Sequence, residues 1–340
     1  MSNLLNENIE KAMKEFGVRL INDAEYDEYI SNENAKWRSE YVRQGDFKSF
    51  DGLNLRYYNA FQPKGETSQG CIVIVHGYCG FWGKFHEIAH YFWQAGYEVF
   101  FLEQRGHGYC GRQTDDKDMV HVGDYSDYVK DVKLLMDNVI LPSIGNIPCI
   151  LFSHSMGGAI GTLFMEEHPG YFEGAVLSSP MFSIKTGKIP KIAVYLLRAK
   201  VKLFRQELQP FPGGKRFDGI PVFASSSTRS EVRYNYIFNQ RLKDEHYHTY
   251  MFSNGWGCAS FRATGKVLKN AAKVKIPVLM FTSGNDSFVN MDGAEIFKKR
   301  AACVKHIHFE EAKHELFNDT DEVRAVYFNN IFDFVKTIRL

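Results

Sequence analysis

The sequence lacks several features that define whole classes of protein. Its six cysteines stand singly, with no Cys-x-x-Cys pair, which disfavours a disulfide framework and predicts reduced thiols, several of them in buried strands. The formal net charge is only +1, so no electrostatic case exists for nucleic acid or an anionic membrane. The sequence has neither a run of about 18 apolar residues nor a basic-then-apolar leader, and we expect a cytoplasmic protein.

The composition is that of a globular protein with an unusual share of aromatic residues. At 340 residues the chain is one large domain or two small ones, and its hydrophobic fraction of 44% is ordinary. Aromatic residues reach 15%, which suits either a large apolar pocket or an aromatic core. The chain contains no internal repeat and no low-complexity tract.

Apolar runs alternate with helical patterns along much of the chain. Strands are expected at 71–75, 99–102, from 149, at 175–180, 277–283 and 306–309. Helices are expected at 84–95, 124–140, from the glycines at 157–158 to about 168, and at 321–338. A hairpin is expected at 45–61, broken at Asp51-Gly52. Alternation of this kind predicts an α/β fold with a doubly wound, mostly parallel sheet, whose carboxyl edge gathers the chemistry.

One serine lies between the end of an apolar run and a glycine-rich helix start. The stretch Cys149–Gly158 is Cys-Ile-Leu-Phe-Ser-His-Ser-Met-Gly-Gly. A tight strand-to-helix turn requires small residues two places before and after the nucleophile, whose Oγ it lifts clear of the backbone. Ser153 replaces the usual first glycine and Gly157 matches the second. The pattern predicts a hydrolase nucleophile at Ser155, with a helix-capping serine as the structural alternative.

A serine nucleophile needs a base and an acid that orients the base. His314 follows the last predicted strand and is the candidate base, while Asp286 follows the preceding strand and is the candidate acid. The order Ser, Asp, His along the chain is the one expected for such hydrolases. We therefore expect Ser155, Asp286 and His314 to converge at the carboxyl edge. Other histidines lie within the last strand, beside the nucleophile or earlier in the chain: His107, His121, His154, His306 and His308.

Two backbone N–H groups should bind the oxyanion of a tetrahedral intermediate. They belong to Met156, which starts the helix, and Tyr78, which follows His76-Gly77 after the first buried strand. Four aromatic side chains are expected either to line an acyl pocket or to be plain packing: Phe81, Trp82, Phe182 and Trp256. This chemistry requires no metal and no organic cofactor.

Several of these motifs also resemble those of the α/β-hydrolase fold family, and within it the monoacylglycerol lipase and lysophospholipase branch. The matching pieces are His76-Gly77, the motifs at 103–112, 153–158 and 284–289, and the histidine block at 312–319. The last, with the run 223–256, is similar to bacterial lysophospholipase L2 proteins. The resemblance covers about residues 45–338 and implies the α/β-hydrolase fold, serine esterase chemistry and a glycerol-lipid or lysophospholipid substrate. The loop after Gly77 departs from monoacylglycerol lipases, because Gly80, Phe81 and Lys84 replace their usual Glu-His pair and arginine.

Residues 181–265 interrupt the alternation with a basic stretch, a Pro/Gly segment and many aromatic residues. An insertion between late core strands lies above the carboxyl edge, so we expect a helical cap, or lid, over the site; ordinary surface helices are the alternative. The expected division is an N-terminal helical extension at 1–44, a core at 45–180 and 266–340, and a cap at 181–265. The extension carries a helical stripe over 1–30, which either packs on the body or meets lipid: Leu5, Ile9, Met13, Phe16 and Leu20.

The sequence therefore predicts a serine hydrolase that cleaves a carboxylic ester of a lysophospholipid or monoacylglycerol. Its expected partner is a small lipid ester, not nucleic acid, and a transient contact with a membrane surface, with a peripheral location, stays open. Two alternatives also stay open. One is an aminopeptidase or amidase that uses the same triad. The other is a non-catalytic binding protein built on the hydrolase scaffold.

Overall fold

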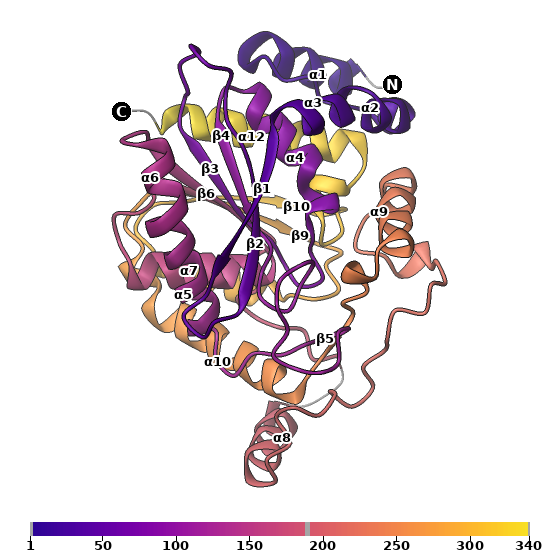
Figure 1. Ribbon diagram of the computed structural model, residues 1–340, viewed down its shortest axis with the longest axis vertical. Helices are drawn as coiled ribbons and strands as arrows, with labels where there is room; N and C mark the ends of the chain where they lie inside the picture. Colours follow the sequence, from indigo (N-terminus) through magenta and orange to yellow (C-terminus); the bar gives the residue numbers. More distant parts are fainter. Residues whose placement is uncertain (1–2, 188–190, 339–340) are drawn as a thin grey trace.

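The computed structural model describes residues 3–187 and 191–338, with the side chains of 191–195 outside the description. A single eight-stranded sheet forms its centre (Figure 1), in the order β1-β2-β4-β3-β6-β7-β9-β10. The pairs β1–β2 and β2–β4 are antiparallel and the remaining pairs are parallel. The expected doubly wound, mostly parallel sheet is thus confirmed. Its strands are β1 (Val42–Lys48), β2 (Asn54–Ala60), β3 (Cys71–Val75), β4 (Glu98–Leu102), β6 (Cys149–His154), β7 (Gly174–Ser178), β9 (Val278–Ser283) and β10 (Val304–Phe309).

Helices cover both faces of the sheet because its central strands are apolar on both sides. Every residue of β3, β4, β6 and β7 is buried. Along β3, Val73 belongs to the hydrophobic cluster on one face and Ile74 to the cluster on the other. The first face carries α5 (Ser126–Leu135), α7 (Met156–Glu167), α10 (Asn254–Asn270) and α11 (Met291–Arg300). The second carries α4 (Trp82–Gln94) and α12 (Asp321–Thr337).

The remaining elements are short or lie outside the two layers. The helix expected at 124–140 is α5 followed by a π-helical turn (Met136–Ile140) and α6 (Leu141–Ile144). The predicted hairpin is confirmed as β1 and β2, which pair from Val42 opposite Ala60. Short 3-10 helices occur at Asp23–Glu25, Phe223–Ser225, Glu245–Tyr247, Ala271–Lys273 and Leu316–Asn318.

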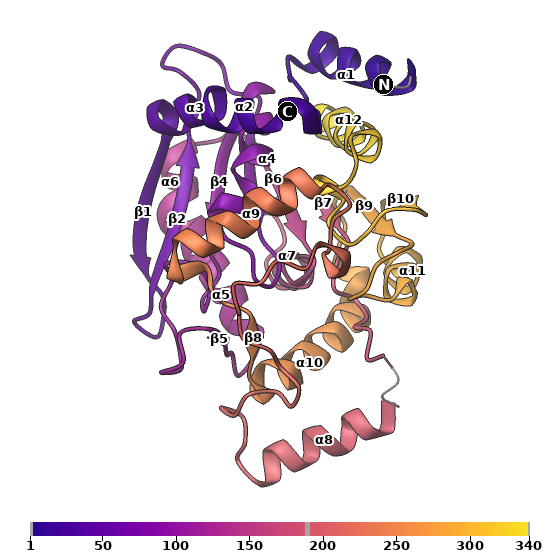
Figure 2. The same cartoon turned by 90° about the vertical axis from the view of Figure 1, so that its right-hand side faces the viewer.

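The N-terminal extension contains three helices, so the single helical stripe expected over 1–30 is wrong beyond residue 16. Helix α1 (Asn3–Phe16) ends at Gly17, whose φ of +71° suits glycine, and α2 (Tyr26–Ser31) and α3 (Glu33–Tyr41) follow. Figure 2 shows α1 lying along α12, and the rings of Phe16 and Phe332 are 5.5 Å apart. Leu5 and Phe16 of this stripe are therefore packed on the body, as the first of the two expectations predicts, whereas Met13 is 49% exposed.

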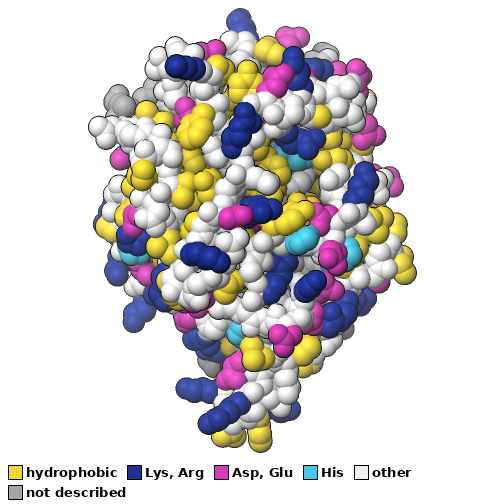
Figure 3. All heavy atoms as spheres, in the orientation of Figure 1, with side chains coloured by type: hydrophobic (Ala, Val, Ile, Leu, Met, Phe, Trp, Pro, Cys, Tyr) yellow, Lys and Arg dark blue, Asp and Glu magenta, His cyan; other side chains and the backbone are white. Residues whose placement is uncertain are grey.

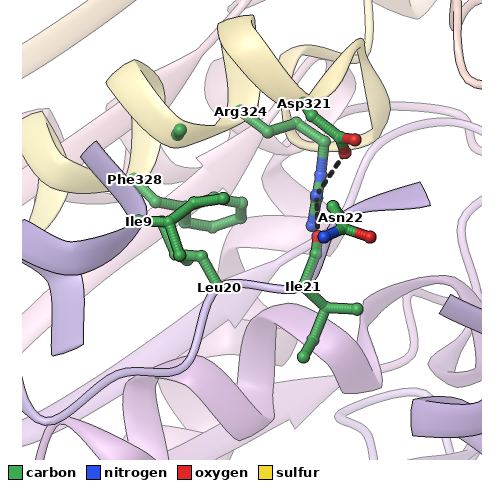
Figure 4. Close-up of a pocket in the computed structure, with 8 residues that line it drawn as sticks. Ile9, Leu20, Ile21, Asn22, Asp321, Arg324 and Phe328 are labelled. Atoms are coloured by element: carbon green, nitrogen blue, oxygen red, sulfur yellow. Dashed lines mark hydrogen bonds and ion pairs between the residues drawn. The ribbon is translucent and has the colours of Figure 1, made fainter. Parts of the chain in front are cut away.

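The chain between α1 and α2 is fastened to α12. Figure 4 shows Ile9 and Leu20 beside Phe328, and Arg324 beside Asp321. The cavity among them is about 10 Å³, room for one water molecule at most. These contacts hold the extension in place, and the cavity between them is too small to admit a substrate.

The expected cap contains α8 (Lys191–Leu203), α9 (Glu231–Lys243) and β8 (Met251–Phe252), which pairs in parallel with β5 (Met119–Val120) of the core. Figures 1 and 2 both show α8 at the lower end of the molecule, and α10 is its neighbour there. The boundary expected at 265 falls inside α10, and α10 packs against α7 and α11 in a helical layer of the core. We therefore propose a cap of 181–253. Across the described residues, no helix has the length and apolar character needed to cross a membrane.

Candidate active site

Ser155 occupies a strained turn between β6 and α7. Its φ of 53° and ψ of −117° are unusual for a residue with a side chain, and such strain persists only where the surroundings hold it. The Ser155 N–H donates to Ser178 O at 3.0 Å. A Cβ on Gly157 would lie 2.1 Å from Val75 O, and a Cβ on Gly158 would lie 2.6 Å from the Pro180 Cβ. Both glycines are thus required for α7 to approach the sheet, while Ser153 beneath them is fully buried.

Ser155, His314 and Asp286 are brought together in one chain of hydrogen bonds. His314 Nε2 lies 2.8 Å from Ser155 Oγ, and His314 Nδ1 lies 2.6 Å from Asp286 Oδ2. Asp286 and His314 are each 5% exposed, whereas Ser155 is partly exposed. A carboxylate can only accept, so Nδ1 carries the proton and Nε2 is free to accept the serine proton.

The carboxylate of Asp286 is itself held by the backbone. Its Oδ1 accepts the N–H groups of Phe288 at 2.7 Å and Val289 at 3.0 Å. Burial alone would raise the pKa of Asp286. The hydrogen bond and charge of His314, with these backbone donors, outweigh burial and keep the pKa below its usual value. Asp286 is therefore ionised at neutral pH and provides the anion that orients the imidazole.

The competing histidines have other partners. His154 Nδ1 lies 3.1 Å from Ser178 O, and burial followed by the nearby charge of His314 lowers the pKa of His154. His306 and His308 both bond the Thr282 hydroxyl, at 2.8 Å each. His121 bonds Ser253 and His107 bonds Arg105 O. His314 is the histidine that the structure places on Ser155.

The turn at Gly77–Gly80 lies against the nucleophile. A Cβ on Gly77 would lie 3.0 Å from the Ser155 Cβ. The Gly77 carbonyl faces the other way, since it accepts the Gly80 N–H at 3.0 Å and lies 2.7 Å from His76 Nδ1. In a trans peptide the N–H points opposite to the C=O, so the N–H of Tyr78 is directed away from these donors.

His76 fixes this arrangement through its tautomer. The Gln104 N–H donates to His76 Nε2 at 2.8 Å, so the proton must sit on Nδ1, which donates to the Gly77 carbonyl. Burial lowers the pKa of His76 to about 4, which keeps the ring neutral. Met156, the other expected donor, is fully buried at the first turn of α7. Within the described part of the chain, neither the Tyr78 nor the Met156 N–H donates to another group of the protein.

The four aromatic residues expected at a pocket are not gathered at one place. Trp82 stacks on Tyr58, with ring centroids 4.8 Å apart, in the cluster beneath the N-terminal helices. Phe182 packs on Phe297, and Phe81 stacks on Tyr247 of the cap. Trp256 packs at 4.9 Å on the ring of Tyr78. Phe81 follows the Gly77–Gly80 turn directly in the chain. Of the other three, Trp256 is the one whose ring packs on a residue of that turn.

Comparison with known proteins places the chain in a family. A family model described as "Serine aminopeptidase, S33" (Hydrolase_4) matches residues 66–321. The chain belongs to this family. As an S33 family member it is a serine hydrolase with the α/β-hydrolase fold.

Relatives of this S33 family member include a lysophospholipase and a monoacylglycerol lipase of bacteria. It is 25% identical to lysophospholipase L2 of Escherichia coli over 87% of this chain and 89% of that protein. It is 26% identical to monoacylglycerol lipase of Mycolicibacterium smegmatis, over 81% of this chain and 91% of that protein. A solved monoglyceride lipase of Saccharomyces cerevisiae shares the fold, with a TM-score of 0.71 and 18% identity over 89% and 98% of the two chains.

The sequence did not single out an ion pair beside His314. Glu315 is 5% exposed. Its Oε1 accepts hydrogen bonds from Lys84 Nζ of α4, at 2.5 Å, and from the hydroxyl of Ser227 in the cap. Burial alone would raise the pKa of Glu315, but the charge of Lys84 outweighs it and the pKa falls to about 2. The signal available in the sequence was the position of Glu315 next to the candidate base. No group of three or more His, Cys, Asp or Glu side chains suited to a metal ion occurs among the described residues of this S33 family member.

Proposed function

We propose that this protein hydrolyses a carboxylic ester of a lysophospholipid or monoacylglycerol, with Ser155 as nucleophile, His314 as base and Asp286 as orienting acid. The observation that carries the proposal is the chain of hydrogen bonds from Ser155 Oγ through both imidazole nitrogens to Asp286. Its supports are the strained turn at Ser155 and the close approach of Gly77 to the Ser155 Cβ.

The reaction has two halves. Ser155 Oγ attacks the acyl carbon while His314 Nε2 takes its proton, and the oxyanion accepts the N–H groups of Tyr78 and Met156. The C–O bond to the alcohol then breaks and His314 returns the proton to the leaving alcohol. Water, deprotonated by His314, attacks the acyl-enzyme, and the fatty acid leaves as Ser155 recovers its proton.

The lipid substrate class is supported by the relatives, whose names are lysophospholipase and monoacylglycerol lipase. The family description instead names an aminopeptidase, which keeps the amidase alternative in place. An aminopeptidase needs a carboxylate for the substrate amine. Two carboxylates lie next to His314, Asp286 in contact with its ring and Glu315 after it in sequence, and both are already engaged, Asp286 by His314 and Glu315 by Lys84. This observation favours the ester.

We also propose that the cap makes the contact with lipid aggregates that the sequence left open. Figure 3 shows apolar and basic side chains together at its lower tip, where α8 lies. Exposed apolar side chains there are Leu196, Leu203, Phe204 and Leu208, and exposed basic ones are Lys200, Lys202 and Arg205. Although the net charge of the whole chain is only +1, this local mixture of apolar and basic side chains suits an anionic bilayer surface. Equal sedimentation of the protein with anionic vesicles before and after Leu203→Ser/Phe204→Ser would contradict this role.

A substrate panel tests the function. Monoacylglycerols, lysophospholipids, p-nitrophenyl esters and aminoacyl p-nitroanilides are compared, with Ser155→Ala as the blank. We expect turnover of lipid esters by the native chain and none by Ser155→Ala. Turnover of aminoacyl amides alone would favour the aminopeptidase, and the absence of both turnover and labelling by a fluorophosphonate would favour a binding protein.

A further inference from the structure

The C-terminal turn of cap helix α9 is bonded to the turn that carries the Tyr78 N–H. Arg241 Nη2 donates to Cys79 O at 2.7 Å, and Arg241 Nη1 donates to the carbonyls of Tyr247 at 3.0 Å and Thr249 at 3.1 Å. Tyr78 adds a bond in the other direction, from its hydroxyl to Tyr250 O at 2.8 Å. Arg241, the cap loop 247–250 and the Gly77–Gly80 turn thus form one hydrogen-bonded unit.

The environment of Arg241 is unusual for a buried charge. Arg241 is 8% exposed, and buried guanidinium groups are normally paired with carboxylates. Among the ion pairs of the described residues, none includes Arg241. By contrast Arg233, at the other end of α9, pairs with Asp23 and Glu87. The guanidinium of Arg241 instead donates to three carbonyl oxygens, one of which belongs to the Gly77–Gly80 turn.

That carbonyl lies at the strained residue of the turn. Cys79 has a φ of 57°, in the left-handed region that glycine or asparagine would adopt more readily. A residue in this conformation relaxes unless its neighbours hold it. Cys79 directly follows Tyr78 in the chain, and Arg241 provides a charged donor to the Cys79 carbonyl. The Gly80 N–H donates to Gly77 O and closes the turn.

We propose that Arg241 is a positioning residue for the oxyanion site: it holds the Cys79 carbonyl so that the Tyr78 N–H points at the acyl oxygen. The proposal rests on the proposed function, because it assigns a role within the same reaction. Arg241 acts through the turn and touches no reacting atom. The cap is then part of the catalytic scaffold at this end of α9.

The test uses the rate at which a fluorophosphonate modifies Ser155, since this step needs no knowledge of the natural substrate. The serine oxygen bonds to phosphorus, fluoride leaves, the serine proton passes to His314, and the phosphoryl oxygen occupies the oxyanion site. Arg241→Met keeps the length of the side chain and removes its donors, and Arg241→Lys keeps the charge. Arg216→Met is the matched control, because Arg216 is an exposed cap arginine paired with Asp116.

Loss of a whole oxyanion donor costs about 10²–10³ in rate, and a misdirected donor costs part of that. We expect Arg241→Met to lower the labelling rate and the kcat for p-nitrophenyl butyrate by about 10–100-fold, with KM changed less than about twofold. Arg241→Lys should fall between Arg241→Met and the native chain, and serves alone if Arg241→Met does not fold. Arg216→Met should match the native chain.

The outcomes are separable. Native labelling at Ser155 with unchanged rates in Arg241→Lys and Arg241→Met overturns the role of Arg241 and leaves the proposed function intact. A rise in KM with unchanged kcat does the same, since it indicates a cap that only binds substrate. Failure of the native chain to be labelled at Ser155 contradicts the proposed function, and the role of Arg241 falls with it.

Discussion

Replacement of Asp286 by asparagine tests the triad through its tautomer. The Oδ1 of Asp286 accepts two backbone N–H groups, from Phe288 and Val289. In the variant the amide oxygen must take this place, because an NH₂ group would face two donors. The NH₂ group is then aimed at His314 Nδ1, which must accept. The ring proton moves to Nε2, and His314 can no longer take the proton of Ser155.

The expected loss follows from this reversed imidazole. For the corresponding change in a well-studied serine protease the fall in kcat is about 10⁴, which corresponds to about 5.4 kcal/mol of activation free energy at 1.36 kcal/mol per tenfold. We expect the same order here for hydrolysis of p-nitrophenyl butyrate near pH 7.5, with the melting temperature little changed. The loss should lie in kcat, because the amide leaves the substrate site unaltered.

A matched control removes a weaker contact to the same carboxylate. Ser283 Oγ lies 3.4 Å from Asp286 Oδ2, too long for a strong bond, so Ser283→Ala should keep kcat within a few-fold. If Asp286→Asn retained more than a tenth of the native activity while still folded, the assigned orienting role would be refuted.

Three further predictions concern stability. Gly157→Ala places a Cβ 2.1 Å from Val75 O and should lower the urea-measured unfolding free energy by about 3 kcal/mol or more, whereas Gly265→Ala, with nothing within 4 Å, should be neutral or gain about 0.5–1 kcal/mol; equal effects would contradict the packing argument. Lys84→Met leaves the Glu315 carboxylate buried and unpaired, which should cost about 3–5 kcal/mol, and adding Glu315→Gln should recover most of it in the same titration. The folded-state pKa of Glu315 is about 2, below the ordinary 4.5, so its contribution is complete above pH 4.5 and lost as pH falls toward 2. The melting temperature of Glu315→Gln should therefore fall less steeply than that of the native chain over this interval, and parallel curves would count against the ion pair.

Local patterns were sufficient to predict the core and the tight turn that carries Ser155. The β3 and β6 runs are apolar at every residue, which distinguishes buried parallel strands from amphipathic helices without knowledge of their partners. Ser155 was found because the turn constrains its immediate neighbours, and Gly157 is one of them. His314 was found because the carboxyl ends of parallel strands meet at one edge, which turns a position in sequence into a position in space.

Contacts between distant segments could not be predicted in the same way. Trp82 lies two residues after the Gly77–Gly80 turn in sequence, but α4 begins there and Trp82 stacks on Tyr58. The boundary expected at 265 falls inside α10, and nothing local in the sequence distinguishes this helix, which packs on the core, from a cap helix. Arg241 is 162 residues from Cys79 along the chain, and no spacing rule links the two. By contrast, the end of α1 at Gly17 had a local signal, since glycine commonly ends helices.

The most direct test of the central claim is a titration of lipid-ester hydrolysis against covalent modification of Ser155. A fluorophosphonate is added in steps, the modified fraction of the Ser155 peptide is measured by mass spectrometry, and hydrolysis of a monoacylglycerol is measured in the same samples. We predict that activity falls in proportion to modification and reaches zero when Ser155 is fully modified. Hydrolysis that persists with Ser155 fully modified would contradict the account.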